Sequence, residues 1–190
     1  MLIIGLGNPG REYRETRHNI GFMLLDRLAA KLGSRFSRFQ AKAVVATGMV
    51  GDKKWILAKP QTYMNLSGHS VQSLVRFHKV PLDNLIVVHD DIDLPIGIIR
   101  IRPDGGSAGQ KGIASIIERL GTDKFIRIRI GIGRPPGQLQ AAYYVLEKFT
   151  KAETEIVSQT LDRVVDATLE ISLKGLDGAM NKFNGNQAVI

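Results

Sequence analysis

Short apolar runs that end at glycine or proline predict the strands of this chain. Leu2–Leu6 is one such run, and it ends at the turn sequence Gly7-Asn-Pro-Gly10. Ala43–Val50 and Trp55–Ala58 follow, and Gly51-Asp52 between them is typical of a β-hairpin. The remaining predicted strands are a buried one at Leu85–Val88 and two that alternate apolar residues with Arg, at Ile98–Ile101 and Phe125–Ile132.

Apolar residues that recur every three or four positions predict the helices. One helix begins after Asn19, its predicted N-cap, and ends at Gly33. Ser67–His78 and Gln110–Leu120 predict two more, and the last 40 residues are helical in pattern as well. The apolar face of the first helix is Phe22, Leu25, Leu28 and Leu32, and that of the last segment is Val157, Leu161, Val164, Thr168 and Ile171.

The alternation of strands with helices predicts the fold class. Such a sequence favours an α/β fold with a mixed, mostly parallel, twisted sheet flanked by helices on both faces. The chain has no repeat and no Pro/Ser-rich linker, so we expect a single domain over residues 1–190.

Composition narrows the classes of function. The 26 Lys and Arg exceed the 18 Asp and Glu by eight, and the pI is near 9.9. This balance favours a polyanionic partner such as nucleic acid, although basic charge can also serve solubility alone. The chain has no cysteine, and its four histidines are scattered, so no metal site is predicted. The longest uncharged stretch, Pro60–Val75, is polar, so no membrane span is expected. The N-terminal residues do not resemble a targeting signal, and we expect a cytoplasmic protein.

Four polar residues follow the predicted strands and should meet at one sheet edge. Asn8 follows the first strand, His18 precedes the first helix, and Asn65 and Asp90 follow two later strands. Ligands of open α/β sheets bind at the carboxyl ends of the strands. A histidine oriented by an aspartate is a general base, and carboxamides can hold a carbonyl. With no protein nucleophile in view, water would be the attacking group. Each residue also has a structural alternative as a turn, cap or surface residue.

The glycine pattern Gly5-Leu-Gly7-Asn-Pro-Gly10 offers a competing interpretation, a dinucleotide-binding turn. Three features disfavour it. Arg11–His18 separates the pattern from the helix, Pro9 stiffens the turn, and no acidic residue occurs between Arg27 and Gly51.

Basic residues gather in the second half of the chain. Arg100 and Arg102 alternate on one predicted strand, and Arg127 and Arg129 do so on another. The glycine-rich sequence Asp104–Gly112 lies between them and carries Lys111. Paired arginines beside such a loop suit a sugar-phosphate backbone, although an exposed strand face must carry polar residues in any case.

Several linked motifs extend over almost the whole sequence. They are the sequence G-L-G-N-P-G-x-x-Y-x-x-T-R-H-N-x-G over Gly5–Gly21, Tyr63-Met-Asn-Leu-Ser-Gly68, His89-Asp-Asp-Ile-Asp-Leu-Pro95, Arg129-Ile-Gly-Ile-Gly133 and Ala179-Met-Asn-Lys-Phe183. In this order and spacing, the chain resembles bacterial-type peptidyl-tRNA hydrolase. Members of this family cleave the ester between a peptide and the 3′-terminal ribose of tRNA, without a metal or cofactor.

The resemblance implies a role for each candidate residue. His18 would activate water, Asp90 would orient it, Asn8 would help to recognise the acylated end, and Asn65 would hold the substrate carbonyl or water. Tyr13, Tyr63 and Met64 would line the channel for the peptide and terminal nucleotide, and Arg100, Arg102 and Arg129 would grip tRNA phosphate.

One departure from the family pattern concerns the glycine-rich loop. Many members have His-Asn where this chain has Gln110-Lys111. The lysine could contact phosphate or stabilise an oxyanion. It also keeps open an alternative function, that of an RNA-binding relative with weak catalysis. The lack of an extra apolar stripe favours a monomer.

Overall fold

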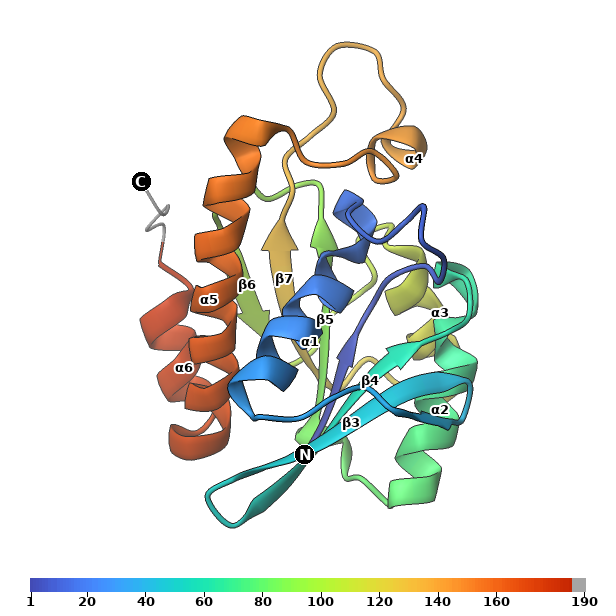
Figure 1. The fold of residues 1–190 in the computed structure, drawn as a ribbon, viewed down its shortest axis with the longest axis vertical. Helices are drawn as coiled ribbons and strands as arrows, with labels where there is room; N and C mark the ends of the chain where they lie inside the picture. Colours follow the sequence, from blue (N-terminus) through green and yellow to red (C-terminus); the bar gives the residue numbers. More distant parts are fainter. Residues whose placement is uncertain (186–190) are drawn as a thin grey trace.

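A computed structural model describes residues 1–185 and contains one seven-stranded sheet (Figure 1). The strand order is β2-β3-β4-β1-β5-β7-β6. The pairs β4–β1, β1–β5 and β5–β7 are parallel, whereas β2–β3, β3–β4 and β7–β6 are antiparallel. The strands are β1 (Leu2–Gly5), β2 (Arg38–Gln40), β3 (Ala43–Val50), β4 (Lys53–Pro60), β5 (Leu85–Asp91), β6 (Ile99–Arg102) and β7 (Ile126–Gly131).

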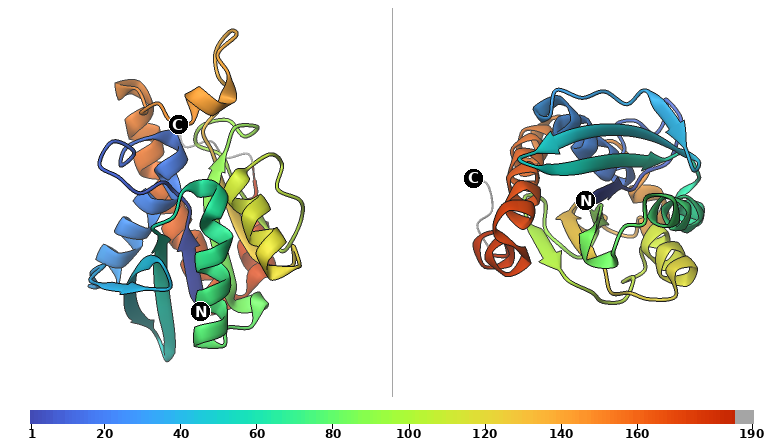
Figure 2. Two further views of the ribbon diagram at one scale, coloured as in Figure 1. Left: turned by 90° about the vertical axis from the view of Figure 1, so that its right-hand side faces the viewer. Right: turned by 90° about the horizontal axis from the view of Figure 1, so that it is seen from below.

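Helices cover both faces of the sheet, as predicted (Figure 2). On one face α1 packs against the sheet beside α5, and α6 packs beside β6, while α2 and α3 pack together on the other face. The short helix α4 lies above the carboxyl ends of the parallel strands (Figure 1). The helices are α1 (Ile20–Lys31), α2 (Ser67–His78), α3 (Lys111–Leu120), α4 (Ala141–Tyr144), α5 (Lys151–Lys174) and α6 (Leu176–Phe183), with single 3₁₀ turns at Arg17–Asn19, Met64–Leu66 and Leu82–Asn84.

The alternation of side chains along β1 divides the interior into two apolar cores. Ile3 points to the face covered by α1 and α5, where it joins a cluster that includes Leu28 and Val164. Leu2 and Ile4 point to the opposite face and pack with residues of α2 and α3. Because β1 is buried on both faces, it is a continuous apolar run, which is why the sequence predicted it correctly.

Two features of the sheet differ from the sequence prediction. The short edge strand β2 was not predicted, because Arg38–Gln40 has no apolar alternation. The alternation of apolar residues with Arg over residues 125–132 is typical of a strand with one exposed face, but this strand is buried on both faces except at Arg129, which is half-buried. Arg127 is therefore buried, and the expectation that it lies on an open phosphate-binding surface is wrong.

Glycines near β1 allow helix α1 to pack closely against the sheet. A side chain at Gly5 would collide with the Gly21 carbonyl, and one at Gly7 would meet the Phe22 ring at 2.8 Å. The 3₁₀ turn at Arg17–Asn19 and then α1 follow only after a connecting segment, so the glycine pattern does not open a helix. Its first two glycines are explained by helix packing, and the dinucleotide interpretation loses its support.

No helix within residues 1–185 is long and apolar enough to cross a membrane.

Candidate active site

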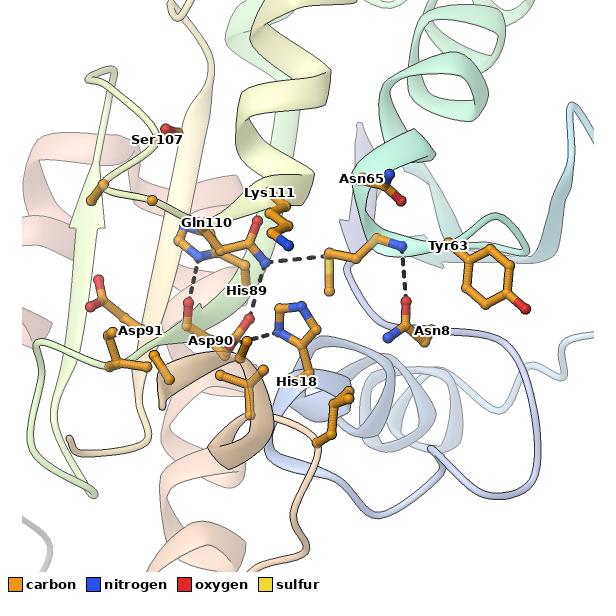
Figure 3. Close-up of a pocket in the computed structure, with 18 residues that line it drawn as sticks. Asn8, His18, Tyr63, Asn65, His89, Asp90, Asp91, Ser107, Gln110 and Lys111 are labelled. Atoms are coloured by element: carbon orange, nitrogen blue, oxygen red, sulfur yellow. Dashed lines mark hydrogen bonds and ion pairs between the residues drawn. The ribbon is translucent and has the colours of Figure 1, made fainter. Parts of the chain in front are cut away.

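The structure brings together His18 and Asp90, which lie 72 positions apart in the sequence (Figure 3). His18 belongs to the 3₁₀ turn that precedes α1, and Asp90 lies near the carboxyl end of β5. The His18 Nδ1 and the Asp90 Oδ2 are 2.8 Å apart, a strong hydrogen-bond distance. The sequence-based expectation that strand ends would gather polar groups at one edge therefore holds for this pair.

Asp90 is set up to remain a carboxylate. Its side chain is almost fully buried, and burial by itself would raise the pKa of this group. The charge of His18 and the hydrogen bonds from His18 and Gln110 outweigh burial and lower the pKa of Asp90 below its usual value. Since a carboxylate only accepts hydrogen bonds, Nδ1 of His18 carries the hydrogen in this contact.

Gln110 forms a second support for Asp90. Its amide Nε2 donates to the Asp90 Oδ1 at 3.0 Å and lies 3.3 Å from the sulfur of Met64. Its Oε1 accepts the backbone N–H of Ile113, which caps helix α3. The residue that departs from the usual family pattern is thus integrated into the site, and its contacts could not have been read from the sequence.

Asn8 links two walls of the site through its side-chain amide. Its Oδ1 accepts the Met64 N–H at 2.8 Å, and its own backbone N–H and carbonyl are bound by the Asn19 side chain at 2.9 Å each. Because the oxygen of Asn8 is engaged, its NH₂ group remains as a donor beside the cleft (Figure 3). Asn19 occupies the predicted N-cap position of α1, but its side chain holds Asn8 instead of capping the helix.

These groups border a cleft of about 600 Å³. Its walls include Asn65 and Lys111, which are exposed, and the largely apolar face of the α4 segment (residues 141–149). Tyr63 stands at the rim with 61 % of its surface exposed. Of the sequence-predicted residues, the cleft is lined by Asn8, His18, Tyr63, Met64, Asn65, Asp90 and Lys111. Tyr13 is not among the lining residues and lies on the neighbouring segment before the 3₁₀ turn.

A partly buried ion pair behind His18 was missed by sequence reasoning. Arg17 is 3 % exposed and forms two hydrogen bonds with Glu153, at 3.1 and 2.8 Å. Its guanidinium also lies over the rings of Tyr144 and Phe149. The backbone N–H of His18 donates to the Val145 carbonyl at 2.8 Å. The turn that carries His18 is therefore fixed to the α4 segment and to the start of α5.

The basic residues of β6 and β7 lie at the opposite edge of the sheet from β2. Arg100 pairs in register with Arg129, and Arg102 pairs with Arg127. Arg102 is exposed and Arg100 is half-buried, whereas Arg129 forms an ion pair with the Asp91 carboxylate at 2.5 Å. Asp91 itself borders the cleft, so this pair connects the basic edge to the site.

Within residues 1–185, no three His, Cys, Asp or Glu side chains are grouped so that they could hold a metal ion.

Comparisons with known proteins agree with this arrangement. A family model described as peptidyl-tRNA hydrolase matches residues 2–189. A peptidyl-tRNA hydrolase of Desulforamulus reducens is 50 % identical over 183 residues, covering 96 % of this chain and 88 % of the relative. One of a Thermoanaerobacter species is 47 % identical, covering 97 % and 99 %. The crystal structure of peptidyl-tRNA hydrolase from Acinetobacter baumannii, 33 % identical, superposes with a TM-score of 0.90 over 97 % of this chain and 94 % of that one. On this evidence the chain belongs to the peptidyl-tRNA hydrolase family.

Proposed function

We propose that this enzyme hydrolyses peptidyl-tRNA with water as the nucleophile and His18 as the general base. The observation that carries the proposal is the 2.8 Å contact between the His18 Nδ1 and Asp90, which leaves Nε2 available at the cleft. As water attacks the ester carbonyl carbon, Nε2 takes its proton, and the Asp90 carboxylate stabilises the resulting imidazolium.

The second half of the reaction returns that proton. The tetrahedral intermediate collapses, the bond from the carbonyl carbon to the ribose 3′ oxygen breaks, and His18 protonates the departing oxygen. The products are a peptide with a free carboxylate and a tRNA with a free 3′ hydroxyl. The NH₂ groups of Asn8 and Asn65 are suited to hold the carbonyl oxygen while it carries negative charge. The scheme uses only water and side chains of this chain.

Substrate binding is assigned to two surfaces. The apolar wall of the α4 segment, with Tyr63 and Met64 opposite, suits the peptide and the terminal nucleotide. Arg100, Arg102 and Arg129 at the β6–β7 edge suit the phosphates of the acceptor stem, with Arg129 already oriented by Asp91. Tyr13 would contribute only at the margin, because it does not line the cleft.

Lys111 is assigned to phosphate binding close to the reacting ester. It is exposed at the cleft and begins helix α3, whose N-terminal end favours anions. Lys111→Met should raise KM more than it lowers kcat. A second variant, Lys111→Asn, introduces the residue that is usual at this position in the family. An unchanged KM in both variants would remove Lys111 from the binding surface.

A direct test separates the enzyme from a catalytically weak RNA-binding relative. The protein is incubated with N-blocked aminoacyl-tRNA, and the release of free tRNA is compared with the spontaneous rate. We expect multiple turnovers. Binding without release above the spontaneous rate would favour the alternative function.

Two further expectations accompany this function. We propose a cytoplasmic location, because peptidyl-tRNA arises during translation. We also propose a monomer, which is supported by the distribution of the large exposed apolar side chains over different elements, such as Phe39 on β2 and Leu173 on α5. Light scattering at micromolar concentration tests the second expectation.

A further inference from the structure

We propose that Arg127 is a positioning residue for the reaction, because it grips the glycine-rich loop (residues 103–110) and thereby holds Gln110 against Asp90. The inference rests on the proposed function, since the chemistry at His18 and Asp90 supplies one of its two readouts. The sequence pattern groups Arg127 with the phosphate-binding arginines, whereas in the structure its guanidinium donates to backbone carbonyls of Gly105, Gly106 and Asp123.

The guanidinium of Arg127 is anchored in the sheet and reaches the loop. Its side chain lies on β7 and is 3 % exposed, with the guanidinium 4.9 Å from the centre of the Phe125 ring. One terminal nitrogen donates to the Gly106 carbonyl at 2.7 Å. The other donates to the carbonyls of Gly105 and Asp123. Two successive carbonyls of the loop are therefore fixed to a buried residue near the start of β7.

The far end of the same loop is fixed at the catalytic pair. The Gln110 N–H donates to the Ser107 carbonyl at 2.9 Å, and the Gln110 side chain donates to Asp90. Between these two ends the backbone has positive φ angles at Ala108 (47°) and Gly109 (80°). Gly109 has much conformational freedom to lose, and Ala108 holds a conformation that L residues rarely adopt, so the position of the segment depends on its anchors.

The loop between the anchors is also a wall of the cleft. Ser107, Ala108 and Gly109 all line it, next to Gln110 and Lys111. A shift of the loop would therefore displace both the amide that supports Asp90 and the cation that faces the substrate. Catalytic constellations lose rate steeply when a supporting group moves by as little as about 1 Å.

The chemistry of the side chain explains why an arginine occupies this buried position. Burying a guanidinium is unfavourable unless its N–H groups find acceptors. Arginine has a planar fork of donors that can bind several carbonyls at once, which an aliphatic residue cannot do. At Arg127 three loop and turn carbonyls accept from the two terminal nitrogens, whereas Nε has no hydrogen-bond partner within residues 1–185.

Arg102 is a natural control for Arg127. The two residues are register partners on β6 and β7, but Arg102 is exposed and directed to solvent. If Arg127 bound tRNA phosphate, as proposed for Arg102, substitution of either residue would raise KM.

The kinetic experiment is a double-mutant cycle on the full-length enzyme. Arg127→Met and Gln110→Ala are each expected to lower kcat on N-blocked aminoacyl-tRNA by about tenfold. Because one acts through the other, the double variant should be within about twofold of the slower single variant. In the control cycle, Arg102→Met should raise KM, and its effect should multiply with that of Gln110→Ala.

The second readout does not require activity. The Ile113 amide is protected by the Gln110 Oε1, so Arg127→Met should accelerate its hydrogen exchange, while Arg102→Met should not. Arg127→Lys, which keeps a buried donor, should recover part of the protection and part of the rate. It also replaces the Met variant in the cycle if that variant fails to fold.

The outcomes separate the two proposals. Multiplicative effects of Arg127→Met and Gln110→Ala on kcat, or unchanged exchange at Ile113, would overturn the positioning role. If the wild-type enzyme releases no tRNA, the proposed function fails, and the exchange experiment still decides whether Arg127 holds the loop.

Discussion

In the cleft, Asp90, Gln110 and Asn8 have side-chain atoms bound to other protein groups at distances of 2.8 to 3.0 Å. At the β6–β7 edge, by contrast, Arg102 projects into solvent and Arg100 is half-buried. In the cleft, the polar side chains hold one another in a fixed geometry. At the β6–β7 edge, the charge of Arg102 stays exposed to solvent. General-base catalysis needs fixed geometry, whereas attraction of a polyanion needs only charge of the right sign nearby.

Arg127 and Arg129 lie two residues apart on the same face of β7, yet both differ from Arg102. Each is engaged with the protein, Arg127 with loop carbonyls and Arg129 with Asp91. The border between the cleft, whose polar groups are fixed by the protein, and the basic β6–β7 edge therefore lies along β7. Substitutions on the two sides of the border should differ in what they change: turnover and stability on the cleft side, affinity and salt dependence on the other.

The largest effect is expected at the general base. His18→Ala should lower kcat by at least about 10²-fold, because proton transfer to a positioned base contributes that much or more. Its affinity for tRNA should stay nearly unchanged, since the basic edge is intact. The measurement is release of tRNA from N-blocked aminoacyl-tRNA, with binding measured separately. His69→Ala is a matched control, because His69 lies on α2 and does not line the cleft. A loss of only a few-fold would show that the base is misassigned.

The second effect concerns the internal bracing of the cleft. Asn19→Ala leaves the buried N–H and carbonyl of Asn8 without their partners. Orphaning such groups costs about 1–3 kcal/mol, so the urea midpoint should fall. Asn65→Ala is the control: its side chain is exposed, and its substitution should change stability by no more than about 0.5 kcal/mol while still lowering activity. Equal stability of the Asn19 and Asn65 variants would contradict the described bracing.

The cleft was easier to locate from the sequence than to describe. The apolar runs of β1 and β5 are strong signals, and polar residues just after them had to meet at one edge of a parallel sheet. This placed His18 and Asp90 correctly. The contacts of Asn19 and Gln110 were out of reach, because each depends on a side-chain orientation set by residues distant in the sequence.

The arginines of β6 and β7 show what the sequence pattern alone could not predict. A pattern of alternating Arg and Ile is the same whether the arginines face solvent or a loop that folds back over them. β6 is an edge strand, so Arg102 is exposed, while β7 lies inside the sheet and under the glycine-rich loop. Strand order, which the sequence did not predict, decides between the two cases.

The third effect tests the basic edge alone. Arg100→Glu with Arg102→Glu should weaken tRNA binding by about tenfold at low salt and reduce the slope of log affinity against log salt by about one per lost phosphate contact. Stability and the kcat of bound substrate should change little. Arg35→Glu with Arg38→Glu, near and on the opposite edge strand β2, changes the net charge equally and is the control. If both pairs weaken binding alike, net charge rather than this edge attracts the tRNA.

The smallest effect is a pH-dependent one at the ion pair behind His18. Burial would raise the pKa of Glu153, but hydrogen bonds from Arg17 and Thr150 outweigh it and lower the pKa below the usual value for glutamate. Because the folded-state pKa lies below that of the unfolded chain, the carboxylate stabilises the fold fully only above about pH 5. This contribution is lost as the pH falls through the lowered pKa.

Glu153→Gln is the variant that isolates this contribution. The wild type should exceed it in unfolding free energy at pH 7, and the difference should shrink towards zero as the pH falls below about 4, as measured by urea denaturation at several pH values. Since Arg17 directly precedes His18, the variant should also lose a little turnover at neutral pH without losing affinity for tRNA. A stability difference that stays constant with pH would assign the effect to packing. A change in tRNA affinity would contradict the assignment of Glu153 to the cleft and place it with the tRNA-binding edge.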